Sequence, residues 1–283
     1  MRKTTENFPQ VLFIYKHKYK MDNLYKKFSI WVLIISPLLV YWPTFSNQFQ
    51  MHWDDWWVVM NDYTENGINK DNLIQIFVQF YHGQYAPLNE TYYLLLYNIF
   101  GYNAFVFHFA SLLIHMCNVV LVFFLIKRLL QFSFSLKASS VLRVSFITAL
   151  LMSIHPFSVE PVAWIAASKC LLYTLFYLLA LHTYLSFIIK QKWFFYVSTL
   201  FLFVLSFGSK EQAITLPGCL LLFDFITKRS IRNTTVWLEK LPFLIFAFVF
   251  IVVTFLSQKQ NVDGILSHSI TYPWYQNVVF ASY

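Results

Sequence analysis

The sequence predicts an all-α protein that crosses a membrane several times. Hydrophobic residues make up 58% of the 283-residue chain and charged residues only 12%, whereas soluble domains carry about 25% charged residues. The mean hydropathy is +0.53, and continuous apolar runs of about 15–25 residues are typical of membrane-spanning helices. Strands of a membrane barrel would instead alternate apolar and polar residues. This composition excludes a soluble enzyme, a disordered protein and a disulfide-stapled secreted domain.

The chain divides into a short tail and a long membrane domain. Residues 1–27 are polar and basic and predict a cytoplasmic tail or a short surface helix, whereas residues 28–283 form the predicted transmembrane domain. The first apolar run, Phe28–Phe45, starts late, lacks a small-residue cleavage site and ends in aromatic residues. Such aromatic residues are typical of an interfacial anchor, so we predict an uncleaved first span rather than a signal peptide.

A polar stretch over residues 46–90 forms the predicted first outer loop. It contains HWDDWW (His52–Trp57) and a helical pattern over Asp71–Tyr81. Apolar residues of this pattern gather on one face, which predicts an amphipathic helix lying on the membrane surface. These residues are Leu73, Ile76, Phe77 and Phe80. The segment Ala86–Asn103 predicts a further, partly buried helix.

Six more apolar runs bring the predicted bundle to about seven spans. They cover about Ala104–Ile126, Val144–Ile154, Leu171–Ile189, Trp193–Phe207, Ala213–Ile226 and Leu241–Leu256. The third and fifth spans are short, because about 11 to 15 residues reach only about 17–22 Å against a hydrocarbon core of about 30 Å. We therefore expect less apolar flanks to extend them, or outer loops that dip inward and line a cavity.

The distribution of charge predicts the orientation. With the N-terminus in the cytoplasm, cytoplasmic segments hold 17 of the 21 Lys and Arg residues, and nine of the 13 acids lie outside. The lysines left outside are Lys70, Lys169, Lys210 and Lys259. This asymmetry follows the positive-inside rule. The net charge of +8 is therefore an orientation signal, and we expect no nucleic-acid partner.

Two adjacent acids, Asp54 and Asp55, follow the first span between tryptophans. One interpretation is a pair of solvated loop acids beside an aromatic belt. The other is a general base at the membrane surface, which takes a proton from an acceptor hydroxyl. In that case the second acid tunes the base or holds a divalent metal.

The segment HPFSVEPVAW (His155–Trp164) carries a carboxylate between two prolines. Glu160 is either a solvated acid in a helix-breaking loop or a functional group. The loop ends a short span and is mostly apolar, and an isolated carboxylate at such a depth is costly and usually functional. His155 is interpreted as a loop histidine in a supporting position.

Lys210 and Glu211 lie in GSKEQ, where the fifth predicted span ends outside. They form an ion pair within the loop, or Lys210 contacts a lipid phosphate beside the N-terminal amides of the next span. Adjacent helical residues do not face each other, so Glu160 or a bound phosphate is the expected partner of Lys210. Lys169 opens the fourth span and is expected to assist.

Four segments, taken in order, resemble the membrane half of a transmembrane-and-tetratricopeptide-repeat family. They are HWDD (His52–Asp55), APLNETYYLLLYNIFGYNAFVFHFASLLIH (Ala86–His115), HPFSVEPVAWIAASK (His155–Lys169) and SKEQAITLPGCLLLFDF (Ser209–Phe225). The resemblance runs from about Trp42 to Phe225. Proteins of this family are similar to GT-C glycosyltransferases, which are related to protein O-mannosyltransferases.

The resemblance implies transfer of a sugar from a polyprenyl-phosphate-linked donor on the outer side of the membrane. It implies a catalytic acid in the first outer loop, which corresponds to Asp54 with Asp55 beside it. It also implies functional residues at Glu160, Lys210 and Glu211. The implied partners are the lipid-linked donor, a protein or glycan acceptor and membrane lipids. No cofactor is expected beyond the donor, and a divalent metal is left open.

The sequence departs from the family pattern in two places. Relatives commonly carry an arginine where Ala86 precedes Pro87, so a donor-phosphate contact is missing from that position. Relatives also continue into further spans and helical repeats, whereas this chain ends at NVVFASY in what resembles the start of another span. We therefore expect a chain that is truncated at its C-terminus.

Taken together, the sequence predicts an integral-membrane glycosyltransferase with a GT-C-like bundle. The expected catalytic residues are Asp54, Asp55 and Glu160, the donor-phosphate ligands Lys210 and Lys169, and the supporting residues His52, His155 and Glu211. The alternatives are a non-catalytic scaffold or lipid carrier, and a polysaccharide polymerase or ligase, for which outer-loop arginines would be typical. We expect a multi-pass protein of the plasma membrane in a bacterium, or of the endoplasmic reticulum in a eukaryote.

Overall fold

The computed structural model describes residues 8–230 and 232–265, and side chains within 25–230 and 232–259. This part of the chain is helical throughout and contains no strand, apart from one isolated bridge between Tyr81 and Gln84. The predicted class, a polytopic helical membrane protein, is confirmed. The C-terminal NVVFASY, where a further span was expected, lies outside the described residues.

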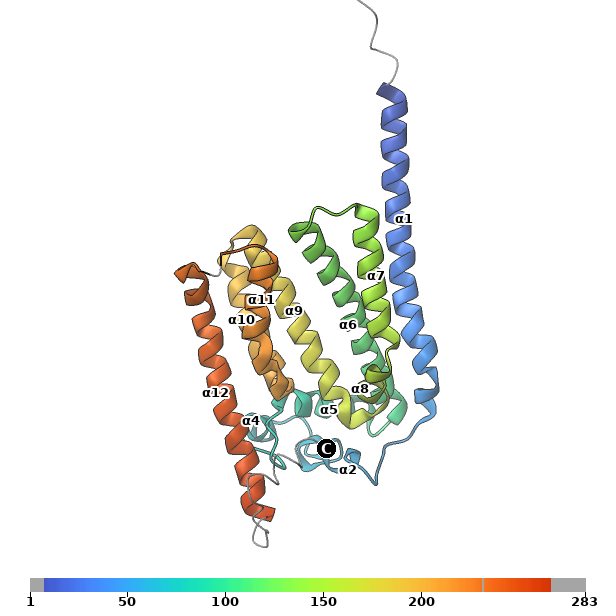
Figure 1. Ribbon diagram of the computed structural model, residues 1–283. Coiled ribbons are helices and arrows are strands. Elements are labelled where there is room, and N and C mark those ends of the chain that lie inside the picture. The colour runs from blue at the N-terminus through green and yellow to red at the C-terminus, as the bar shows by residue number, and fades with distance from the viewer. Residues whose placement is uncertain (1–7, 231, 266–283) are drawn as a thin grey trace, which may run out of the picture.

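Long helices run up and down between two ends of a bundle (Figure 1). They are α1 (Phe8–Tyr41), α6 (Ala104–Ser133), α7 (Ala138–Ile154), α9 (Lys169–Lys190), α10 (Trp193–Ser209), α11 (Leu216–Ile226) and α12 (Thr234–Ile265). These helices correspond one to one to the predicted spans. We call the end that carries residues 47–103 the outer end, after the predicted orientation, and the opposite end the inner end.

The spans differ in length from the predicted apolar runs. Four helices of the described chain are long and apolar enough to cross a membrane, and α7 adds a fifth if it is joined to the bent segment after it. α7 and α10 have 17 residues each, about 26 Å, because polar flanks extend them as expected. α11 is the shortest, with 11 residues, and the 3-10 turn Glu211–Thr215 (η4) precedes it at the outer end.

The N-terminal tail is not separate from the first span. Helix α1 runs without a break from Phe8 to Tyr41. Residues 10–36 contain neither proline nor glycine, so nothing in the backbone interrupts the helix after Pro9. The membrane span is therefore the second half of a longer helix, which projects beyond the other helices at the inner end (Figure 1).

Short elements fold together over the outer end (Figure 1). From the first outer loop come η1 (Trp42–Ser46), α2 (Asp55–Val58), α3 (Asp62–Glu65), α4 (Lys70–Val78) and α5 (Pro87–Phe100). From the loop before α9 come η2 (Pro156–Ser158), α8 (Val159–Ala163) and η3 (Ile165–Ser168). Tyr93 on α5 joins the two groups, because its buried hydroxyl lies 2.9 Å from both the Ile165 carbonyl and the Ser168 hydroxyl.

The predicted amphipathic helix exists, but its apolar face packs on protein. Ile76 of α4 is buried in a cluster with Tyr63 and with Leu94 of α5. Phe77, which we had placed on the same face, is instead 46% exposed. α5 covers the face of α4 that was predicted to lie on the membrane. α4 therefore packs on protein and supports the folded outer end.

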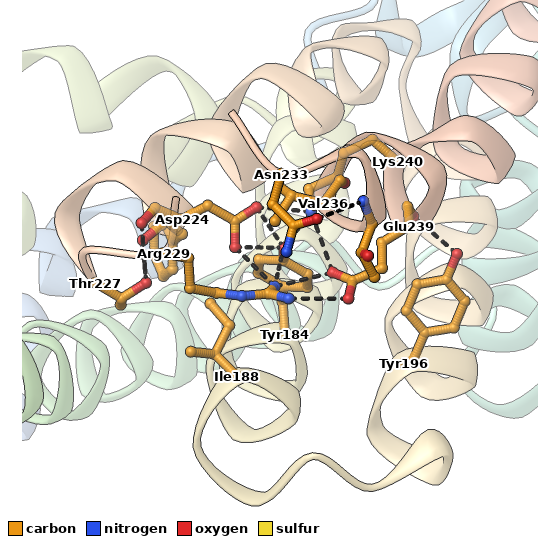
Figure 2. A network of polar contacts seen from close by, with 12 residues as sticks. Tyr184, Ile188, Tyr196, Asp224, Thr227, Arg229, Asn233, Val236, Glu239 and Lys240 are labelled. Carbon is orange, nitrogen blue, oxygen red and sulfur yellow. Dashed lines mark hydrogen bonds and ion pairs between the residues drawn. The ribbon is translucent and has the colours of Figure 1, made fainter. Parts of the chain in front are cut away.

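The inner end contains a cluster of four charges, of which Asp224 and Lys240 are buried and Arg229 and Glu239 are partly exposed (Figure 2). Arg229 donates to Asp224 at 3.0 Å and to both carboxylate oxygens of Glu239 at 2.9 Å. Lys240, which is fully buried, lies 2.6 Å from Asp224 and also hydrogen-bonds the Tyr184 hydroxyl. Two cations thus neutralise two anions, and the cluster ties α12 to α9 and α11.

Candidate functional site

The structure assigns different surroundings to the two adjacent acids. Asp54 is half-buried at the start of α2, and its Oδ1 accepts the Trp57 indole N–H at 3.1 Å. It takes part in no ion pair in the described part of the chain, and its other oxygen accepts no hydrogen bond there. The second carboxylate oxygen of Asp54 is therefore free to accept a proton, as a general base requires.

Asp55 is instead locked into the fold. Its carboxylate is 1% exposed and accepts the backbone N–H of Gln50 at 2.7 Å and that of Ala166 at 2.8 Å. Burial raises the pKa of this carboxyl, and the two backbone N–H groups oppose the rise. With both oxygens engaged, Asp55 is a strut that joins the first outer loop to η3, and the geometry favours Asp54 for chemistry.

Lys169 stands where the predicted charges of the outer end converge. Its Nζ donates to Gln84 Oε1 at 2.8 Å, and the charges of Asp54, Lys210 and Glu211 all lie close enough to act on it. Gln84 is held in place by a tight turn in which His82 and Gly83 both have positive φ, 47° and 75°. Two central residues with positive φ are typical of a type I′ turn, for which glycine is suited.

A cavity of about 340 Å³ contains both Glu160 and Lys210. We call it the lysine cavity. His115 and Asn118 of α6 also line it, and each is at most 1% exposed. His115 Nε2 lies 3.1 Å from the Ser153 carbonyl and Asn118 donates to the Leu171 carbonyl at 2.9 Å. The remaining His115 Nδ1 and Asn118 Oδ1 have no partner in the described protein, so the wall of the cavity contains two buried polar atoms without a hydrogen bond.

Lys210 carries a positive charge that no carboxylate neutralises. Its Nζ donates to Cys170 Sγ at 2.8 Å, and within the described chain neither Lys210 nor Lys169 forms an ion pair. Glu160 shares the cavity with Lys210 but is not within ion-pair distance. The two partners predicted for Lys210 were Glu160 and a bound phosphate. Glu160 forms no ion pair with Lys210, so the ammonium is available for an anion.

The supporting residues are all exposed and form none of the contacts of this group. His52 is exposed, and Glu211 is exposed at the first position of η4. His155 is also exposed and caps η2, because its Nδ1 accepts the Phe157 N–H at 3.2 Å. This contact matches the interpretation of His155 as a loop histidine.

Glu90 is a residue of the outer end that the sequence did not single out. It lies in the first turn of α5, where Asn61 donates to its Oε2 at 3.1 Å. Burial raises its pKa to about 7, against the opposing effects of Asn61 and the Lys169 charge. Acidic residues are common in the first turn of a helix, so the sequence position of Glu90 gives no signal of a special role. Only its burial in the folded protein sets it apart from other such acids.

The described residues contain no group of three His, Cys, Asp or Glu side chains that could hold a metal ion. Asp55, the expected second metal ligand, already accepts two backbone N–H bonds.

Fold and site together define a polytopic helical membrane protein with a cavity at one end of its bundle that is lined by both Lys210 and Glu160. Over 184 residues the chain is 29% identical to the protein O-mannosyl-transferase TMTC1 of Homo sapiens, a match that covers 61% of this chain and 19% of that protein. The chain thus spans about a fifth of the length of this curated relative. No family model and no solved structure matches it. The chain is therefore similar to a glycosyltransferase.

Proposed function

We propose that this protein is a GT-C-type glycosyltransferase, which moves a sugar from a polyprenyl phosphate to an acceptor hydroxyl at the outer end. The observation that carries the proposal is Lys210, an unneutralised cation in a cavity with two unpartnered buried polar groups, His115 and Asn118. Lys210 is only partly buried, but a partly desolvated cation without a counter-charge is still costly. A bound phosphate would supply that charge.

The donor phosphate is proposed to bind Lys210. Lys169, the first residue of α9, adds positive electrostatic potential at the same end of the bundle. An ammonium suits phosphate because it is a compact positive charge. In the reaction the bond between the anomeric carbon and the phosphate oxygen breaks, and the phosphate keeps the electron pair. Lys210 stabilises the charge that develops on that oxygen.

The acceptor is proposed to be activated by Asp54. Its free oxygen takes the proton of the acceptor hydroxyl as the hydroxyl oxygen bonds to the anomeric carbon. Trp57 holds the carboxylate in position through the 3.1 Å indole bond. Asp55 fixes the backbone on which Asp54 stands, and Glu160, between the cavity and the loop, orients the sugar or the acceptor.

Purified full-length chain in lipid nanodiscs, supplied with radiolabelled polyprenyl-phosphate sugars and a hydroxyl-bearing peptide or glycan, tests this function. We expect label to move to the acceptor. Binding of the donor without any transfer, across a panel of sugars and acceptors, would instead identify a lipid carrier.

The orientation is proposed from the lysine and arginine asymmetry. In a cysteine-free background, Asn66→Cys in the outer end and Ser135→Cys between α6 and α7 provide exposed reporters. An impermeant thiol reagent should label Asn66→Cys and spare Ser135→Cys in intact cells, or in sealed vesicles whose outer-end face is turned outward. The reverse labelling would overturn the orientation.

A further inference from the structure

A second cavity of the outer end adjoins the lysine cavity and has a different chemistry. Its volume is about 300 Å³, and it is lined by Gln50, Trp53, Val159, Glu160, Ala163 and Trp164. We call it the tryptophan cavity. Glu160 lines both cavities, so a molecule whose phosphate lies at Lys210 can place its next group beside the tryptophans.

The two tryptophans leave aromatic surface open. Their rings meet edge to face, with centroids 5.6 Å apart and planes at 86°. Trp53 is 66% exposed despite this contact. An edge-to-face contact covers one face of only one of the two rings, so at least one face of Trp53 remains free to pack against a ligand.

Asp55 holds the walls of this cavity together. Gln50 and Trp53 come from the first outer loop, whereas Trp164 comes from the turn between α8 and η3. The Asp55 carboxylate bonds the backbone of Gln50 on one wall and of Ala166 on the other. Because the bond to Ala166 is buried and the bond to Gln50 is partly buried, the two walls are joined without a ligand and the cavity is preformed.

We infer that the tryptophan cavity is a subsite for a pyranose ring. The C–H groups on one face of a pyranose form an apolar patch that packs on an indole. Its hydroxyls donate to a carboxylate and exchange hydrogen bonds with an amide, here Glu160 and Gln50. A volume at the small end of the roughly 300–1,000 Å³ of ligand sites suits one ring rather than a long glycan.

The inference deepens the proposed function and rests on it for the source of the ring. The ring belongs to the lipid-linked donor or to an acceptor glycan. In the tryptophan cavity no cation is among the described residues that line the wall beside Glu160, which disfavours an anionic group there, whereas in the lysine cavity Lys210 is present to bind one. Phosphate and sugar are thereby assigned to neighbouring sites on either side of Glu160.

The test measures binding of methyl α-pyranosides to full-length chain in nanodiscs by saturation-transfer NMR. Trp53→Ala should weaken binding about ten-fold, and Trp53→Phe should retain part of it, because an aromatic face remains. Trp42→Ala is the matched control, since Trp42 is 64% exposed at the same end and outside the cavity. Melting temperatures confirm that each variant folds.

The source of the ring is separated by comparing bare polyprenyl phosphate with polyprenyl-phosphate mannose. If the donor's sugar occupies the subsite, Trp53→Ala removes the affinity gained from the sugar. If an acceptor glycan occupies it, that gain persists and only pyranoside binding falls. Unchanged binding of every sugar in Trp53→Ala overturns the inference. So does quenching of Trp53 fluorescence by brominated lipid, which would assign this residue to an aromatic belt.

The inference and the proposed function fail separately. Transfer activity with unchanged pyranoside binding in Trp53→Ala would leave the glycosyltransferase in place and remove the subsite. Tryptophan-dependent pyranoside binding without transfer of label would keep the subsite and remove the catalytic function.

Discussion

The two ends of the bundle contain charge in opposite states. At the inner end, Asp224 and Glu239 are paired with Arg229 and Lys240 at 2.6 to 3.0 Å. At the outer end, the predicted functional charges bind only neutral groups: Lys169 an amide, Lys210 a thiol and Asp54 an indole. Each charge of the inner cluster has an opposite charge as its partner, whereas the predicted functional charges of the outer end lie beside cavities without one in the described part of the chain.

This contrast separates architecture from function. In the paired inner cluster Asp224 and Lys240 are buried, and removing one of them leaves the other as an unpaired buried charge. Unpaired charges beside a cavity contribute little to stability, so their presence is better explained by a ligand. The following predictions test this division, beginning with the largest effect.

Asp54→Asn should abolish most transfer while leaving the fold intact. The amide keeps the bond from the Trp57 indole but cannot take a proton, and loss of one general base typically costs about 10²–10⁴-fold in rate. The rate of label transfer and the melting temperature are measured together. Asp62→Asn, an exposed acid of the same loop, is the control. Activity within a few-fold of wild type would reduce Asp54 to a loop acid.

Lys240→Met should have the opposite profile. It leaves Asp224, which is fully buried, with one cation fewer, and breaking a buried pair costs about 3–5 kcal/mol. The free energy of unfolding in detergent measures this loss. Lys228→Met, an exposed neighbour of the same loop, should change it little. Adding Asp224→Asn to Lys240→Met should recover part of the loss, and no loss in the single variant would contradict the assignment of the cluster to architecture.

Lys210→Met should weaken donor binding without unfolding the protein. A charge-assisted hydrogen bond is worth about 1.5–3 kcal/mol, which corresponds to about 10–100-fold in affinity for polyprenyl phosphate. The thiol of Cys170, its present partner, is a weak acceptor and loses little. Lys70→Met, exposed on α4, is the control. Lower melting at unchanged affinity would remove the phosphate role of Lys210.

The spans could be predicted from the sequence because burial in lipid needs only long apolar runs. The position of Lys169 and Lys210 at the ends of two apolar helices could be predicted as well, because each lies beside an apolar run. The roles within the Asp54–Asp55 pair could not. They depend on which carboxylate meets the backbone of Ala166, 111 residues away, and local sequence contains no signal for that contact.

The same limit explains the residues that the sequence analysis missed. His115 and Asn118 lie within an apolar span and become cavity groups only where α7 and α9 pack against α6. The apolar face of α4 was predicted from its period, but whether lipid or α5 covers it depends on the tertiary fold. Long-range packing thus determines which side chains meet at the site. Composition determines only the class of protein, a polytopic helical membrane protein.

Glu90→Gln should produce the smallest effect and one that depends on pH. The pKa of Glu90 is raised from an ordinary 4.5 to about 7 in the folded protein, so between these values the folded state binds more protons than the unfolded chain. Stability is therefore fully present below about pH 4.5 and falls as the pH rises through 7. Glutamine is neutral throughout, so the variant should melt higher than wild type at pH 8, by a few degrees.

This difference should vanish toward pH 4.5, where wild-type Glu90 is protonated in both states. The measurement is the difference in melting temperature between Glu90→Gln and wild type at several pH values, because other groups that titrate in the same window cancel in it. A difference that is equal at pH 5 and pH 8 would show that Glu90 ionises normally. The charge of Glu90 would then not destabilise the folded protein. The contrast between the two ends would rest on the lysines and Asp54.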